Sequence, residues 1–209
     1  MLVVSAWALT VLPSGISVPI HWDPNGRPDA FASRQVGLFG IPGIAALFSL
    51  VCAFLPEIEP RRANLAASKQ LYYAGWLGSV VVFTGTHIVL LLATSGLPID
   101  VPAVTLLMVA LLVCVLGNFL GKSRSMFFMG TRWPWSLSSE LAWEKSNRFA
   151  AYVYVATGLA TIVALILFGT SVGYLTLLCG IVAGTVAGAV VSFIYWRREQ
   201  NDDSDLPPH

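Results

Sequence analysis

Four polar side chains that can act as ligands lie close together near the N-terminus. His21, Asp23, Asn25 and Asp29 carry the imidazole, carboxylate and amide groups that bind cations, protons or polar molecules. The spacing of Asp23 and Asn25 is that of a calcium-binding loop, but the other ligand positions of such a loop are missing, and we assign no metal. Two interpretations remain. The segment is either an ordered turn that caps the protein, with Trp22 at the membrane interface, or a recognition surface for an extracellular molecule.

A second group of informative residues lies between residues 117 and 148. Arg132 is followed by Trp133 and Trp135, whose rings offer cation–π contacts. Its guanidinium keeps its charge, and it can also reach open backbone carbonyls at a helix end, Glu140 or a lipid phosphate. The segment is therefore either a linker between two helices or an ordered docking site for a partner.

The residues that follow predict the start of a helix. Ser136 or Ser138 can cap its N-terminus, and Glu140 places a negative charge in the first turn. We expect Trp143 to rest on the membrane surface on an amphipathic helix, with Arg148 towards water.

His87 is an ionisable residue deep inside an apolar run. Such residues usually face the interior of a bundle and find a partner, and a nearby hydroxyl such as that of Thr84 would serve. No Asp or Glu lies inside an apolar run, which argues against proton-coupled transport. The sequence shows no nucleophile–base pair, metal-ligand helix or phosphate-binding loop, so we expect no catalytic residue and no cofactor. Two other functions are alternatives to a role in recognition and docking. One is a small-solute transporter or channel lined by His87 and the outer loop, and the other is a membrane enzyme that uses His21 and Asp29.

The elements that position these residues are membrane-spanning helices. Hydrophobic residues make up 56% of the 209-residue chain and charged residues 11%, against about a quarter charged in soluble domains. The formal net charge of +1 provides no basic field for nucleic acid. A span needs about 20 apolar residues, and five runs reach or approach that length after a shorter first run. These runs are Met1–Leu12, Val36–Leu55, Leu71–Ser95, Val101–Gly117, Phe149–Gly169 and Val172–Trp196. The sequence predicts an all-α polytopic bundle of six transmembrane spans, the first one short, in a lipid bilayer.

Basic residues predict the orientation of this bundle. Loops 56–70 and 118–148 and the C-terminal tail together hold ten Lys and Arg residues, whereas loop 13–35 holds two. By the positive-inside rule, both termini and the two basic loops are cytoplasmic, and loop 13–35 faces outside. We expect three units: residues 1–55 with the outer loop, residues 56–117, and residues 118–209 with a disordered tail.

Gly180, Gly184 and Gly188 recur every four residues in the last apolar run and therefore share one helix face. Such a face lets another helix approach closely, either within the monomer or in a homo-oligomer.

Three separated segments resemble, in order, motifs of the SdpI family of bacterial membrane proteins. They are residues 12–31, with a Pro-x-His-Trp-x-x-x-Gly-x-x-Asp pattern, residues 54–62, with Pro-Glu-Ile-Glu-Pro-Arg-Arg, and residues 117–152. The matching positions in the first and third segments are Pro19, His21, Trp22, Gly26, Asp29, Asn118, Gly130, Arg132, Pro134, Trp135, Leu137, Trp143 and Arg148. The chain departs from the family pattern at Met126, Trp133 and Asn147, where Asn, Thr and His are expected.

The resemblance implies a protein of the bacterial inner membrane that gives immunity to an extracellular peptide toxin. The family includes the immunity protein against the SdpC-derived toxin of bacilli. It also implies, for some members, the binding of a repressor-like regulator at the cytoplasmic face. We therefore expect the toxin to contact the outer loop and the regulator to contact the inner one. The residues expected to bind are His21, Trp22, Asp23, Asn25 and Asp29 outside, and Asn118, Arg132, Trp135, Trp143 and Arg148 inside.

Overall fold

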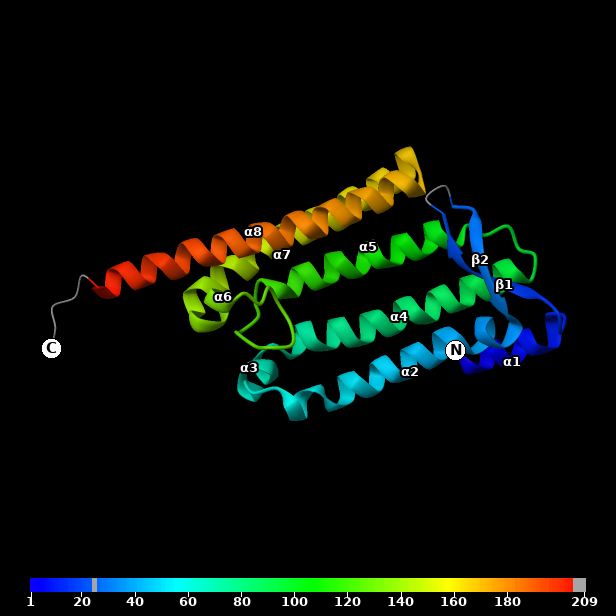
Figure 1. The fold of residues 1–209 in the computed structure, drawn as a ribbon, viewed down its shortest axis with the longest axis horizontal. Coiled ribbons are helices and arrows are strands. Elements are labelled where there is room, and N and C mark those ends of the chain that lie inside the picture. Colours follow the sequence, from blue (N-terminus) through cyan, green and yellow to red (C-terminus); the bar gives the residue numbers. More distant parts are fainter. Residues whose placement is uncertain (24–25, 205–209) are drawn as a thin grey trace.

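The computed structural model describes residues 1–23 and 26–204. Within these residues, five long helices run side by side, accompanied by a short N-terminal helix and a β-hairpin (Figure 1). The long helices are α2 (Arg34–Ile58), α4 (Lys69–Thr94), α5 (Val101–Leu120), α7 (Glu140–Phe168) and α8 (Thr170–Ser204). The predicted helical bundle with a short first helix is confirmed.

The surfaces of the long helices are those of membrane spans. Large aliphatic side chains such as Leu47, Val81 and Ile166 are 63%, 65% and 74% exposed. A water-soluble protein does not tolerate so much exposed apolar surface, whereas lipid tails solvate it. Each long helix has at least 20 residues, so that it reaches across the hydrocarbon core of about 30 Å.

The two ends of the bundle differ in their covering elements (Figure 1). One end, which we call the hairpin end, carries strands β1 (Ser17–Trp22) and β2 (Pro28–Ser33). The opposite end carries the short helices α3 (Arg62–Ala67) and α6 (Pro134–Ser138), and we call residues 121–139 there the inner loop. Between the ends, α7 packs on both α5 and α8, and α4 packs on α2 and α5.

Helix α1 (Leu2–Val11) does not cross the bundle. Its ten residues span about 15 Å, half of a hydrocarbon core. Ala8 and the following Leu12 pack against Leu38 of α2 and Leu91 of α4, which holds α1 beside the hairpin-end half of these helices. The cytoplasmic position of the N-terminus stays a prediction.

The glycine face of α8 is occupied within the chain. A Cβ atom at Gly180 would lie 2.3 Å from Thr157, and one at Gly184 would lie 2.5 Å from Tyr154. Gly188 lies next to the inner loop. These approaches bring α8 close to α7 and favour packing inside the monomer, because a homo-oligomer through the same face would have to displace them.

Two predicted boundaries differ from the structure. The expected surface helix around Trp143 is the first part of α7, which continues into the membrane without a break. Helix α8 extends to Ser204, so the prediction that the chain is disordered from residue 201 is wrong for residues 201–204. Residues 205–209 of the predicted tail lie outside the described part of the chain.

Candidate functional site

The outer segment forms a β-hairpin, where the sequence predicted a loop of turns. β1 and β2 pair antiparallel, with Ser17 opposite Ser33 at the base. Irregular pairing on both sides of His21 marks bulges, which twist a strand and change the direction of its side chains.

Asp23 closes the hairpin turn. Its carboxylate accepts a hydrogen bond from the backbone N–H of Arg27 at 2.9 Å, and its carbonyl accepts one from Gly26 at 2.9 Å. Gly26 has a φ of +78°, which favours glycine and is typical of tight hairpins. Asn25 lies outside the described residues, so its expected role is not placed. Asp23 therefore has a structural role in the turn besides any binding role.

His21 and Asp29 lie together across the hairpin. Nδ1 of His21 is 2.5 Å from Oδ1 of Asp29, and the two side chains are 68% and 45% exposed. Exposed ion pairs contribute about 0–1 kcal/mol, so the main effect of this one is to orient the imidazole rather than to stabilise the fold.

The hairpin is fixed to α2 at its base. Val18 is fully buried, and a Cβ atom at Gly37 would lie 2.6 Å from it, so only glycine lets the strand approach this closely. The guanidinium of Arg34 donates to the carbonyl of Leu9, which ties the start of α2 to α1. These contacts hold the base of the hairpin in a fixed position on α2.

A cavity of about 480 Å³ lies between the hairpin and the ends of α4, α5 and α8, and we call it the hairpin cavity. His21, Trp22 and Asp23 line it from the hairpin. The hydroxyl oxygens of Thr86 and Thr105, which line it from α4 and α5, are buried and have no hydrogen-bond partner among the described residues. The other lining residues are Ile20, Val101, Pro102, Ser171 and Tyr174. An apolar cavity with two unpaired hydroxyls suits a ligand that has both apolar groups and hydrogen-bonding groups.

At the opposite end, a buried carboxylate organises the inner loop. Glu59, which follows α2, is 1% exposed. Its oxygens accept hydrogen bonds from the backbone N–H groups of Phe127 and Phe128 at 3.1–3.2 Å, and from that of Arg61 at 3.0 Å. Three N–H donors satisfy the buried charge and hold the two loops together.

Arg61 adds a second set of contacts between these loops. Its guanidinium donates to the hydroxyl of Ser125 and to the carbonyl of Leu137 at 2.7 Å, and it lies 5.2 Å from the centre of the Phe127 ring. The amide of Asn64 donates to the carbonyl of Ser125 at 2.7 Å. The segment between α2 and α4 is therefore the scaffold of the inner loop.

Trp143 is buried under the inner loop, and the expectation that it rests on the membrane surface is wrong. It is 1% exposed, and its indole N–H donates to the carbonyl of Ser123 at 3.0 Å. Gly130, with a φ of +100°, crosses its ring so closely that a Cβ atom there would lie 2.6 Å away. One turn later, the Asn147 side chain accepts from the N–H of Thr131 at 2.8 Å. Trp143 and Asn147 thus fix the course of the loop over α7.

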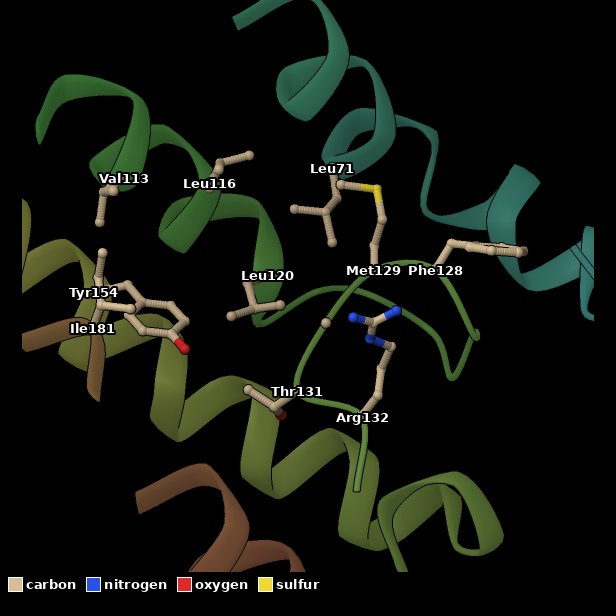
Figure 2. Close-up of a pocket in the computed structure, with 11 residues that line it drawn as sticks. Leu71, Val113, Leu116, Leu120, Phe128, Met129, Thr131, Arg132, Tyr154 and Ile181 are labelled. Atoms are coloured by element: carbon tan, nitrogen blue, oxygen red, sulfur yellow. The ribbon is translucent and has the colours of Figure 1, made fainter. Parts of the chain in front are cut away.

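Arg132 lines a pocket beside the loop, and Figure 2 shows its guanidinium next to Met129. One of its nitrogens donates to the carbonyl of Phe127 at 2.7 Å. The expected bond to a backbone carbonyl thus exists within the loop rather than at a helix end. The expected stacking on tryptophan is not among the cation–π contacts of the described residues.

Trp135 attaches the loop to α8. Its indole N–H donates to the carbonyl of Ala189 at 3.1 Å and to the hydroxyl of Ser192, and its ring stacks on that of Trp133 with the centres 5.9 Å apart. Ser136 bonds back to the N–H of Trp133, and Ser139, not Ser136 or Ser138, caps α7.

Asn118 and Arg148 line a separate cavity of about 640 Å³ at the same end, together with Lys122. Arg148 also pairs with Glu144 at 2.8 Å. The structure therefore divides the predicted inner residues into two groups. Arg132 and Trp135 belong to the inner loop and Trp143 packs beneath it, whereas Asn118 and Arg148 line a basic groove next to it.

Comparisons with known proteins cover both ends of the chain. Residues 122–196, which hold most of the inner loop, match the SdpI/YfhL protein family, and residues 1–46, which hold the hairpin, match a domain of unknown function, DUF1648. These matches support the resemblance of the chain to the SdpI family. The chain is similar to the immunity protein SdpI of Bacillus subtilis (strain 168), with 25% identity over 182 residues, which cover 87% of this chain and 84% of that protein. No solved structure matches the chain significantly.

The three departures from the SdpI-family pattern lie inside the packed loop. Met126 is fully buried and packs with Leu65, Tyr72 and Trp143. Trp133 stacks on Trp135, and the amide oxygen at Asn147 accepts a bond that a histidine ring nitrogen can also accept. These substitutions are accommodated by internal contacts.

His87 has a different partner from the one expected. Its Nε2 lies 2.9 Å from the hydroxyl of Ser5, whereas Thr84 donates to the carbonyl of Val80 in its own helix. The residue is fully buried at the contact between α1 and α4. A structural role for His87 agrees with this position.

Proposed function

We propose that this SdpI-family protein protects the cell that makes it against an extracellular peptide toxin, which it binds at the hairpin cavity before the toxin disrupts the bilayer. The proposal rests on one observation: the hairpin is held on α2 and lines a cavity that contains two unpaired hydroxyls. The similarity to an immunity protein gives the class of function. The basic-residue pattern supports the assignment of this end to the outside.

The chemistry of the cavity fits a peptide. Trp22 and Tyr174 supply aromatic surface, and aromatic residues are enriched at protein interfaces. Thr86 and Thr105 supply hydroxyls that can pair with backbone groups of an extended segment, and these hydroxyls gain partners when it binds.

The test is survival of B. subtilis cells that lack their own SdpI, express this chain and are exposed to the SdpC-derived toxin. We expect the wild-type chain to protect them. Thr105→Val removes a cavity hydroxyl with little change of shape, and it should reduce protection. The matched control is Thr84→Val, which removes a hydroxyl bonded within its own helix.

A second pair of variants tests the hairpin. Trp22→Ala should weaken protection, whereas Phe31→Ala should not, because Phe31 is 58% exposed on the same hairpin and does not line the hairpin cavity. Equal survival of all variants at matched protein levels would rule out the hairpin cavity as the binding site. No protection by the wild-type chain would contradict the function itself.

The alternatives have less support. A transport path through His87 is disfavoured by its complete burial against Ser5. An enzyme that uses His21 and Asp29 would rest on a largely exposed pair whose bond is internal to the hairpin.

We propose docking of a cytoplasmic regulator as a second function, located at the groove of Asn118, Lys122 and Arg148. Two cations beside an amide favour an acidic segment of the partner. Transcript profiles after toxin exposure should change in cells with the wild-type chain and not in cells with Lys122→Ala and Arg148→Ala. Arg124→Ala, an exposed cation of the same loop that does not line the groove, is the control. Identical profiles with and without the groove residues would contradict the regulator site.

A further inference from the structure

We propose that the pocket beside the inner loop binds an anionic phospholipid of the cytoplasmic leaflet, with the headgroup phosphate on Arg132 and one acyl chain in the apolar interior. The pocket has a volume of about 320 Å³. Apart from Arg132, its walls are mostly aliphatic and aromatic, as Figure 2 shows.

The charge in this pocket has no counterion in the described structure. The ion pairs among the described residues join His21 with Asp29, Arg62 with Glu57, and Arg148 with Glu144, so Arg132 has no carboxylate partner there. Its one bond to the Phe127 carbonyl leaves further N–H donors of the guanidinium fork available. Arginine prefers to place that fork on a carboxylate or phosphate.

The position of the pocket indicates a lipid rather than a soluble anion. Leu120 is the last residue of α5 and Leu71 is near the start of α4, so the mouth lies where these helices leave the membrane. Val113 lies seven residues deeper on α5, about 10 Å along the helix, so the apolar part reaches into the hydrocarbon region. An ion in solution does not need such an apolar extension, whereas an acyl chain fits it.

The frame around Arg132 is held in place by neighbouring contacts. Gly130 lies against the ring of Trp143, and the N–H of Thr131 is bonded to Asn147. Basic pockets between transmembrane helices on the cytoplasmic side bind anionic headgroups, and Arg132 gives this pocket its positive charge. The same end carries the excess of basic residues.

The experiment uses the purified full-length chain in neutral detergent and native mass spectrometry, with phosphatidylglycerol or phosphatidylcholine of identical chains added. We expect the wild type to retain phosphatidylglycerol preferentially. Arg132→Gln should lower that retention about tenfold, which corresponds to the loss of one charge-assisted contact. Arg124→Gln, a control in the same loop that does not line the pocket, should retain the lipid as the wild type does.

A second variant covers the case in which Arg132→Gln disturbs the loop. Val113→Phe fills the deep part of the pocket and leaves Arg132 intact, and it should also reduce retention. Inorganic phosphate in millimolar excess should not displace the lipid. Equal retention by all variants, equal retention of the two lipids, or displacement by phosphate alone would each overturn the proposal.

Discussion

Glu59 accepts the backbone N–H of Phe127 on both of its carboxylate oxygens, at 3.2 and 3.1 Å, although the two residues are 68 positions apart. The loop between α2 and α4 and the inner loop are therefore one folded unit at the end of the bundle. Both segments carry motifs that resemble the SdpI-family pattern.

The first prediction concerns this carboxylate. Glu59→Ala removes a buried side chain and the acceptor of three part-buried N–H groups, and it should lower the free energy of unfolding by about 3 kcal/mol. Thermal melting in detergent and trypsin cleavage at Lys122 and Arg124 measure the effect. Glu57→Ala is the control, because Glu57 is 71% exposed and its pair with Arg62 at 3.6 Å contributes about 1 kcal/mol at most. Equal melting temperatures for the two variants would refute the organising role of Glu59.

The second prediction concerns Gly130. An alanine there meets both an unfavourable φ of +100° and the Trp143 ring at 2.6 Å, so Gly130→Ala should destabilise the loop by about 2–4 kcal/mol. Gly15→Ala is the control, since a Cβ atom at Gly15 meets nothing within 4 Å. Melting curves of the two variants measure the difference, and a wild-type curve for Gly130→Ala would show that the loop is not packed on Trp143.

The spans were predictable because lipid imposes length and apolarity on each helix separately. The turn-forming sequence Asp-Pro-Asn-Gly predicts a reversal of the chain in the outer segment, and the hairpin agrees with it. The pairing of the flanking residues as strands β1 and β2 was not predicted.

The burial of Trp143 also had a local sign. Ser146 and Asn147 lie on the same face of α7, one turn further on, and small polar residues beside a tryptophan indicate contact with other protein rather than with lipid. No local sequence signal indicates that Glu59 is buried. An acid between prolines and arginines resembles a solvated turn, and two of its three N–H donors come from a segment more than 60 residues later.

The third prediction concerns orientation. The ten-to-two distribution of basic residues places the hairpin outside and the inner loop inside. An alkaline phosphatase fusion after Gly26 should be active, and one after Lys122 should be inactive. The reverse result would exchange the sides of the toxin and lipid sites and contradict both proposals.

The fourth prediction concerns the buried pair of Ser5 and His87. The hydroxyl of Ser5 lies 2.9 Å from Nε2 of His87 and donates to the carbonyl of Leu38 at 2.7 Å, so one side chain joins α1 to both α4 and α2. Hydrogen bonds between membrane helices contribute about 0.6–1.7 kcal/mol. A double-mutant cycle of Ser5→Ala and His87→Leu, measured by unfolding in detergent, should therefore give a coupling energy of about 1 kcal/mol.

His87→Asn tests the function of the same position, because the amide has no titratable proton and its loss of the Ser5 contact costs only about 1 kcal/mol. We expect it to keep expression and toxin survival near the wild-type level, as a structural role requires. Thr84→Val, whose hydroxyl bond stays within α4, is the matched control and should show no coupling with Ser5→Ala. Normal expression with lost survival in His87→Asn would mean that the imidazole does more than join two helices, and it would revive the transport interpretation.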